Sequence, residues 1–369
     1  MADNKENKVL NVPALRFPEF TEEWNYESLD TIAPNITSGR SKPSLGEYNL
    51  YGSTGIIGKT ATADYSGDML LVARVGANAG SLQLVNDSCG ITDNTLIIKP
   101  CKLSSHYLYF YLQHYNLNRL VFGSGQPLIT AGMLKKVRIP FGNQLEQKKI
   151  ENFLCCIDER ITTQNKIIEK LETLIKGIVE LAFSHAATSN TLGCYITQIS
   201  QRNKTGKDLP VLSVSNKHGF VEQSEQFEDR IIASDDTSNY KIVDINDFAY
   251  NPARINVGSI ARLKDKECGI VSPMYICFRT SKDILPEYLE LFFKTVTFSF
   301  EVGKRLEGSV RLCLSYESLC EIVIPIISIR EQQSLVKMVT TFHSKLDVEK
   351  GFLSSYQLQK QCLLSQMFI

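Results

Sequence analysis

The chain repeats itself at half its length, and this repeat is the strongest constraint on its fold. The segment IPFGNQLEQ at 139–147 corresponds to IPIISIREQ at 324–332, an offset of 185 positions in a chain of 369 residues. At the same offset, and without a gap, Phe183 corresponds to Phe368. A repeat of this length predicts two copies of one domain, each large enough to bury its own core.

Further upstream the two halves match at smaller offsets. Offsets of 180, 179 and 163 relate Arg74 to Arg254, Cys89 to Cys268 and Leu29 to Leu192. Insertions therefore fall in the loops. Each half has the same order: a Gly-rich globular segment with short β-type runs, an Ile-Pro pair, and a long helix.

The two long helices share one pattern. From Gln144 to Ser184 the chain contains no Pro, and its apolar residues recur in steps of four and three, which is the spacing of a coiled-coil seam. The predicted seam comprises Ile150, Leu154, Ile157, Ile161, Gln164, Ile168, Leu171 and Ile175 in the first helix, and Leu335, Val339, Phe342, Leu346, Glu349, Leu353 and Tyr356 in the second. Gln164 and Glu349 interrupt both seams at the same place, where a polar residue fixes register and partner choice.

These features predict an α+β fold with two pseudo-repeated mixed α/β domains separated by two long helices. Because a duplicated chain tends to place its halves about a pseudo-two-fold axis, we expect the helices to be antiparallel, forming a rod about 60 Å long with one domain at each end. The expected boundaries are an N-terminal segment at 1–26, domains at 27–143 and 186–328, and helices at 144–185 and 329–369.

Composition excludes several classes of protein. The formal net charge is zero, with +3 on residues 27–143 and −2 on residues 191–328, so DNA binding would require basic residues gathered on one face. The ten cysteines include no CxxC pair and the histidines no ligand spacing, which indicates reduced thiols and no metal. Without a signal peptide or an apolar run long enough for a bilayer, we expect a cytoplasmic protein.

Three stretches are similar to catalytic motifs, but they do not assemble an active site. GSTGIIGKT at 52–60 has Ser53 where a phosphate-binding P-loop requires glycine. VFGSG at 121–125 and NPAR at 251–254 are similar to the cofactor loop and the Asn-Pro-Pro-aromatic motif of adenine methyltransferases, but the second proline and the aromatic residue are absent. We therefore predict that the chain is not catalytic by itself.

Several motifs follow one another in an informative order. VPALRFPEFTEEW at 12–24 and YGSTGIIG at 51–58 are followed by the two Ile-Pro…Glu-Gln segments that lead into the long helices. In this order they resemble the specificity subunit of type I restriction-modification systems, over nearly the whole chain. One departure is that VPALRFPEF has no counterpart before the second half, so we expect a role for it outside the repeat.

The resemblance implies a sequence-specific DNA-binding subunit. Each target recognition domain would read one half of a split double-stranded DNA sequence, with the antiparallel helices as the ruler between them. It also implies two methyltransferase subunits, which carry S-adenosylmethionine and modify adenine at N6. Two restriction subunits, which use ATP and Mg to translocate and cleave DNA, complete the complex. No cofactor is expected in this chain.

The duplication also separates residues that both halves share from residues that differ between the halves. A side chain shared by two domains that read different sequences cannot discriminate between them, so Arg74 and Arg254 should be structural or contact phosphate. Gln126 and Arg311 match in place but differ in identity, and because glutamine suits adenine and arginine guanine, we expect base contacts, with solvated loop residues as the alternative. Further candidates for phosphate contact, with surface exposure alone as the alternative, are Arg40, Lys42, Lys59, Arg202, Lys204, Lys207 and Arg262.

A protein-interaction scaffold built on the coiled coil is the alternative function. Zero net charge favours it, whereas the basic, Gly-rich loops of both halves favour DNA. Salt-dependent binding to duplex DNA would separate the two.

Overall fold

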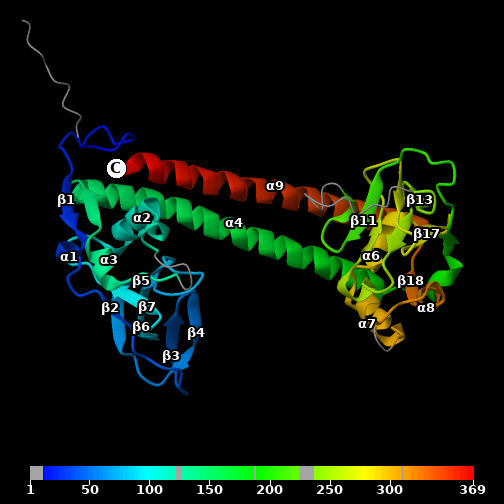
Figure 1. Cartoon of the computed structure of the whole chain (residues 1–369), viewed down its shortest axis with the longest axis horizontal. Coiled ribbons are helices and arrows are strands. Elements are labelled where there is room, and N and C mark those ends of the chain that lie inside the picture. Colours follow the sequence, from blue (N-terminus) through cyan, green and yellow to red (C-terminus); the bar gives the residue numbers. More distant parts are fainter. Residues whose placement is uncertain (1–10, 122–126, 187, 224–236, 309–310) are drawn as a thin grey trace, which may run out of the picture. The chain divides into compact units, whose positions relative to one another are not determined.

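The computed structural model describes residues 11–121, 127–186, 188–223, 237–308 and 311–369. The chain divides into two compact units. Unit 1 comprises Met1–Lys166 and Gly351–Ile369, and unit 2 comprises Ile167–Lys350. Each unit therefore combines one globular half with parts of both long helices, α4 (Gln144–Ser184) and α9 (Ile329–Met367) (Figure 1).

A six-stranded sheet forms the centre of unit 1. Its order is β2-β7-β5-β6-β3-β4, and all neighbours are antiparallel except β3 and β6. The strands are β2 (Thr37–Ser38), β3 (Tyr48–Gly52), β4 (Gly55–Thr60), β5 (Tyr65–Ala73), β6 (Leu82–Ile91) and β7 (Thr95–Ile98). Leu70 and Val72 of β5 pack in one core with α2 (Ser105–Tyr115), while Met69 and Leu71 pack in a second core. Because side chains alternate along a strand, burial on both faces explains the continuous apolar run in β5.

Unit 2 contains two four-stranded sheets, β10-β17-β14-β15 and β12-β11-β16-β13. Their strands are β10 (Ile196–Ile199), β11 (Val211–Ser215), β12 (Gly219–Glu222), β13 (Lys241–Asp244), β14 (Phe248–Tyr250), β15 (Ile260–Arg262), β16 (Cys268–Val271) and β17 (Ile276–Thr280). The counterpart of β5 is divided into β13 and β14 at Asn246, which has φ 71° and corresponds at offset 179 to Gly67, with φ 86°. A left-handed residue therefore occurs at the same place in both halves, where glycine and asparagine are the residues that tolerate it.

Short helices complete both units. Unit 1 has α1 (Leu29–Ile32), η1 (Leu117–Leu120) and α3 (Ala131–Lys135); unit 2 has η2 (Leu192–Cys194), η3 (Ile255–Val257), α6 (Pro286–Phe292), α7 (Val296–Arg305) and α8 (Tyr316–Cys320). At offset 185, α3 corresponds to α8, and the same capping contact begins both. The hydroxyl of Thr130 accepts from Met133 N, and that of Ser315 accepts from Ser318 N.

A two-stranded ribbon frames each globular half. β1 (Asn25–Ser28) pairs with β8 (Arg138–Phe141), and β9 (Thr188–Thr191) pairs with β18 (Val323–Ile326). The offsets 163 and 185 relate these strands residue by residue. The backbone bond that follows also recurs: residue 29 donates to residue 137, and residue 192 to residue 322, both at 2.8 Å. The predicted duplication thus extends to individual hydrogen bonds.

The same glutamine fixes the start of each long helix. Nε2 of Gln147 donates to Gly142 O, and Nε2 of Gln332 donates to Ile327 O, each at 2.9 Å. Gln332 is fully buried, and its Oε1 also accepts from Leu285 N at 2.9 Å. Because buried backbone groups require partners, this use of the side chain accounts for the recurrence of the glutamine in both halves.

The long helices run antiparallel. In unit 1, Asp158 of α4 pairs with Lys360 of α9 at 2.6 Å, and Ile150 of α4 shares a core with Met367 of α9. Residue numbers therefore rise along α9 in the direction in which they fall along α4. Every predicted seam residue is buried or half-buried, including Gln164, which is 6% exposed. The predicted fold class, two related α+β domains with two long antiparallel helices, is confirmed.

A phenylalanine near the end of each long helix enters an aromatic cluster. In unit 1 the ring of Phe368 lies 5.5 Å from that of Tyr107, and in unit 2 the ring of Phe183 lies 4.7 Å from that of Tyr288. In both units the tyrosine hydroxyl donates to the carbonyl oxygen of the proline in the Ile-Pro pair, at 3.0 and 2.9 Å. The end of one long helix is thereby joined to the strand that precedes the other.

The N-terminal segment is anchored to unit 1. Leu15 N donates to the last turn of α9, and Arg16 makes two hydrogen bonds, at 2.7 and 2.9 Å, to the fully buried Glu146. At offset 185 Glu331 instead accepts from Ser328 and caps its own helix. The segment VPALRFPEF therefore has its partner in unit 1, whereas in unit 2 the corresponding carboxylate is engaged locally.

No helix in the described part of the chain is long and apolar enough to cross a membrane. The ten cysteines form no disulfide, and the described residues contain no group of three or more His, Cys, Asp or Glu side chains that could hold a metal ion.

We expect Phe368→Ala to destabilise unit 1 and Phe183→Ala to destabilise unit 2, each by about 3–5 kcal/mol, because truncating a buried ring leaves a cavity. Hydrogen exchange measured by mass spectrometry on the full chain would locate each effect. Ile369→Ala, at a residue 40% exposed, is the neutral control. Equal loss of protection in both units from either variant would contradict this arrangement.

Candidate nucleic-acid interface

The predicted basic residues of the first half lie on or next to the sheet of unit 1. Arg40 and Lys42 are exposed on the loop between β2 and β3. Lys59 is exposed on β4, where its Nζ donates to Glu47 O at 3.1 Å and to Asn49 Oδ1 at 2.9 Å. All three side chains are accessible to a polyanion, and Lys59 is the most firmly positioned.

Arg74 lies directly after β5 in a turn held by backbone bonds. Its N–H donates to Asn94 O, and its carbonyl accepts from Ile129 N, both at 2.9 Å. The side chain is half-buried, and its Nε is buried without a hydrogen-bond partner among the described residues. Gln126, the predicted base-reading residue, lies outside the described residues.

In unit 2 a compact loop presents two lysines. Asn203 is fully buried, and its side chain spans the loop: Nδ2 donates to Lys207 O at 2.9 Å, and Oδ1 accepts from Lys207 N at 3.0 Å. Lys204 and Lys207 are exposed on it, and the exposed Arg202 donates to Asn239 Oδ1 at 2.9 Å. The loop therefore presents several positively charged side chains to solvent at fixed positions.

Arg254 and Arg311 lie on neighbouring loops of unit 2, and both are exposed. Arg254 belongs to the turn after β14, and Arg311 to a loop whose ends, Glu307 and Cys313, exchange backbone bonds of 3.0 and 2.8 Å. Leu314 N donates to Pro252 O at 3.1 Å and joins the two loops. In unit 1 the carbonyl of Arg74 is bonded to the equivalent of Leu314, Ile129, so both halves pair the same two loops.

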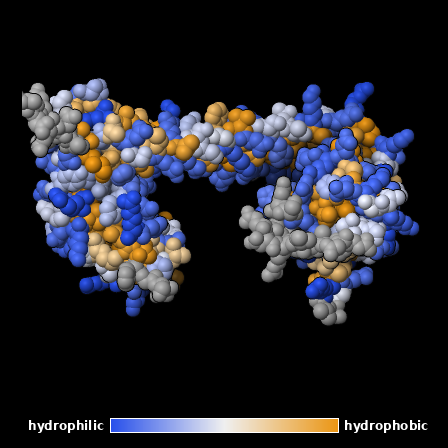
Figure 2. Space-filling view, turned by 45° about the horizontal axis from the view of Figure 1, so that its top comes forward, coloured by the Kyte–Doolittle hydropathy of each residue, from blue (hydrophilic) through white to orange (hydrophobic). Residues whose placement is uncertain are grey.

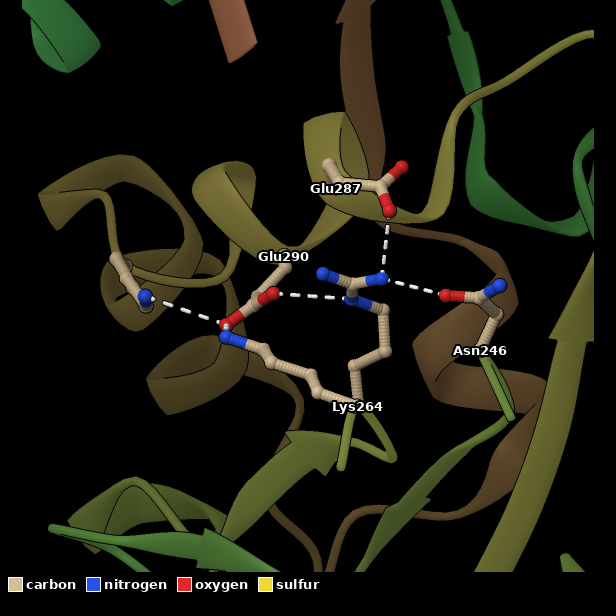
Figure 3. A network of polar contacts seen from close by, with 6 residues as sticks. Asn246, Lys264, Glu287 and Glu290 are labelled. Carbon is tan, nitrogen blue, oxygen red and sulfur yellow. Dashed lines mark hydrogen bonds and ion pairs between the residues drawn. The ribbon is translucent and has the colours of Figure 1, made fainter. Parts of the chain in front are cut away.

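Arg262 differs from the other candidates because protein carboxylates occupy its guanidinium. The side chain is 11% exposed, and Nη1 lies 2.6 Å from Glu287 Oε1 and 2.5 Å from Asn246 Oδ1 (Figure 3). Nε lies 3.0 Å from Glu290 Oε2. This geometry favours a structural role over the predicted phosphate contact. Sequence spacing could not reveal it, since the partners come from two other segments.

Glu290 is the centre of this network. Its carboxylate is 15% exposed and also receives Lys264 Nζ at 2.5 Å and Lys294 Nζ at 3.3 Å (Figure 3). Burial opposes ionisation of the carboxyl group, but the charges of Lys294, Lys264 and Arg262 outweigh it and lower its pKa. Glu290 therefore stays ionised and holds three cations together.

The structure also presents basic residues that the sequence reasoning missed. Lys217 and His218 are exposed at the turn between β11 and β12, and Lys264, Lys266 and Lys294 line the same groove as this turn. The turn Asn216–Gly219 between two β-type runs was a usable hairpin signal. The convergence of three separate segments on one groove had no signal in the sequence.

Residues 9–173 match the family described as the type I restriction modification DNA specificity domain. The comparison with curated proteins gives no match.

Two solved structures share the fold. The S subunit of the type I restriction-modification system from M. genitalium aligns with a TM-score of 0.61 and 20% identity over 97% of this chain and 99% of that one. A chain from a structure describing complex assembly and conformational transition of the type I R-M system aligns with a TM-score of 0.56 and 14% identity over 94% of this chain and 97% of that one. Residues 9–173 are therefore similar to the type I restriction modification DNA specificity domain, and the chain shares its fold with the S subunit from M. genitalium.

Proposed function

We propose that this chain is the specificity subunit of a type I restriction-modification complex and that it binds a bipartite DNA sequence. The observation that carries the proposal is that the same hydrogen-bonded frame occurs in both units. This frame consists of the two-stranded ribbon, the glutamine at the start of the long helix and the hydrogen bond from tyrosine to the proline carbonyl. The loops attached to it carry different polar and basic residues in the two units. A shared frame with different surfaces suits two domains that read two different half-sites. α4 and α9, which contribute to both units, would set the spacing of the half-sites.

Recognition would be divided between positioning and reading residues. Arg74 and Arg254, with Arg40, Lys42, Lys59, Arg202, Lys204 and Lys207, would contact phosphates. Arg311 would read a base in one half-site and Gln126 a base in the other. The exposure of Arg311 on a loop tied at Glu307 and Cys313 supports this role, since direct reading requires a side chain that is both positioned and free to reach a base edge.

The proposal assigns no chemistry to this chain. The segment GSTGIIGKT, which is similar to a P-loop, comprises the turn between β3 and β4 and the whole of β4, whereas a P-loop leads into a helix. The complex would obtain S-adenosylmethionine from two methyltransferase subunits that modify adenine. It would obtain ATP and Mg from two restriction subunits.

The outer surface of α4 supports docking of such partners. Ile167, Leu174 and Leu181 recur every seven residues and are 37%, 46% and 58% exposed. Figure 2 shows hydrophobic residues among hydrophilic ones along the exposed surface of the long helices. An apolar row at heptad spacing fits a helix of another protein. The same row fits the alternative function, a scaffold that does not bind DNA, and salt-dependent DNA binding separates the two.

Mapping of N6-methyladenine across the genome tests the main proposal. Deleting this gene, with the methyltransferase subunit left in place, should abolish methylation at one bipartite sequence, because the enzyme then has no target recognition. Restoring the gene should return the same sites. The proposal would be contradicted if neither deletion nor restoration of the gene changed the methylation pattern in a cell with an active methyltransferase subunit.

Arg311→Ala should relax reading within one half-site only. A good bidentate contact to a base contributes about 1–3 kcal/mol of discrimination, so single-base variants of that half-site should bind nearly as well as the cognate sequence. Arg330→Ala, an exposed arginine in the first turn of α9, is the matched control. Equal weakening at both half-sites would show that Arg311 does not read a base.

A further inference from the structure

A groove of about 730 Å³ runs along unit 2 beside the β11–β12 hairpin. The hairpin lines it together with β15, the loop after β15 and the end of α6. Phe220 and Phe293, both half-buried, contribute apolar surface to it. The groove therefore has a partly apolar wall, and the three segments that line it are separate in the sequence.

The charged lining of the groove is predominantly basic. Lysine and arginine side chains are Lys217, Arg262, Lys264, Lys266 and Lys294, whereas the carboxylates are Glu222, Asp265 and Glu290. Lys217, Lys264 and Lys294 are exposed to solvent. A concave surface with excess positive charge concentrates anions at its wall.

Glu290 gathers more positive charge than it can neutralise. Its single carboxylate contacts Arg262, Lys264 and Lys294, and among the residues that the structure describes only Arg262 of these three has a further carboxylate partner, that of Glu287. Burial lowers the pKa of the nearby His343, and the charges of Lys294 and Lys264 lower it further, while Asp347 and Glu290 act in the opposite direction. Bringing like charges together costs free energy, which a bound anion would offset.

The cluster does not belong to the frame that the two halves share. The pairing of Phe248 with Arg262 corresponds to the pairing of Met69 with Val85, so Arg262 has valine as its counterpart. At offset 181, which relates Tyr107 to Tyr288, Glu290 corresponds to Tyr109. Unit 1 thus folds without this network, and folding of the frame does not account for it.

We infer that the groove holds the sugar-phosphate backbone of the DNA half-site bound by unit 2, with Lys217, Lys264 and Lys294 as phosphate contacts. Glu290 is a positioning residue that sets Lys264 and Lys294 at one wall, and the Lys217 turn lies on the hairpin side. Nε of Arg262 donates a hydrogen bond of 3.0 Å to Glu290 Oε2 and holds this carboxylate in place. The inference rests on the proposed function, because it identifies the surface on which that function would place DNA.

The test is the salt dependence of DNA binding by the full chain in complex with its methyltransferase subunit. Lys217→Ala, Lys264→Ala and Lys294→Ala should each reduce the slope of log K against log salt by about 0.9, since each removed phosphate contact releases fewer counterions. The loss should be equal for cognate and altered second half-sites. Lys345→Ala, an exposed lysine on α9 outside the groove, is the control with the same charge change. Slopes indistinguishable from that control would overturn the inference.

Glu290→Gln separates positioning from simple charge. Removing a negative charge near DNA should tighten binding if only net charge matters, whereas loss of the residue that gathers two lysines should weaken it several-fold. Tighter binding would overturn the positioning role. Thermal unfolding checks that the variant folds, and Lys217→Ala, at an exposed turn, tests the groove independently of the buried network.

The outcomes distinguish this inference from the proposed function. If the wild-type complex shows no preference for any sequence, the proposed function fails. If it binds one bipartite sequence and the groove variants behave like Lys345→Ala, the function stands and the phosphate contacts lie elsewhere on unit 2.

Discussion

Both units depend on the burial of one helix-terminal ring among aromatic side chains from a distant segment. Phe368 meets Tyr107 and Tyr111 in unit 1, and Phe183 meets Tyr288 in unit 2. Such contacts contribute about 0.5–1.5 kcal/mol beyond the area they bury, and the tyrosine hydroxyls extend them to the Ile-Pro strands. In unit 1 the sheet, the ribbon and both long helices share one buried core with Phe368.

The frame and the surfaces that it carries follow different physical rules. Gln147 and Gln332 satisfy backbone carbonyls just before the long helices, a requirement that leaves little freedom of choice, and the same residue is found twice. Exposed loop residues face no such requirement, so Arg311 can differ from its counterpart Gln126 without cost to folding. This separation allows two domains of one fold to present different chemistry.

Much of this architecture could be predicted from the sequence because it depends on local patterns. The offsets 163 and 185 predicted two related halves, and the heptad spacing predicted the two long antiparallel helices α4 and α9. The division of the sheet in unit 2 could not be anticipated, since Asn246 tolerates the same backbone as Gly67 but begins a break rather than continuing a strand. Arg262 appeared as one basic residue among many, because its partners Glu287 and Glu290 belong to α6.

The division of the chain between its units has a consequence for synthesis on the ribosome. Unit 2 is a continuous segment, Ile167–Lys350, whereas unit 1 needs Gly351–Ile369 in addition to its N-terminal residues. Because domains fold once their residues are available, the half that is translated later completes first. Until Phe368 emerges, the aromatic side chains around Tyr107 stay exposed to water and to chaperones. In a nascent chain that stalls in the last turns of α9, unit 2 would therefore be folded while unit 1 exposes an apolar surface. Such a chain would be prone to aggregate.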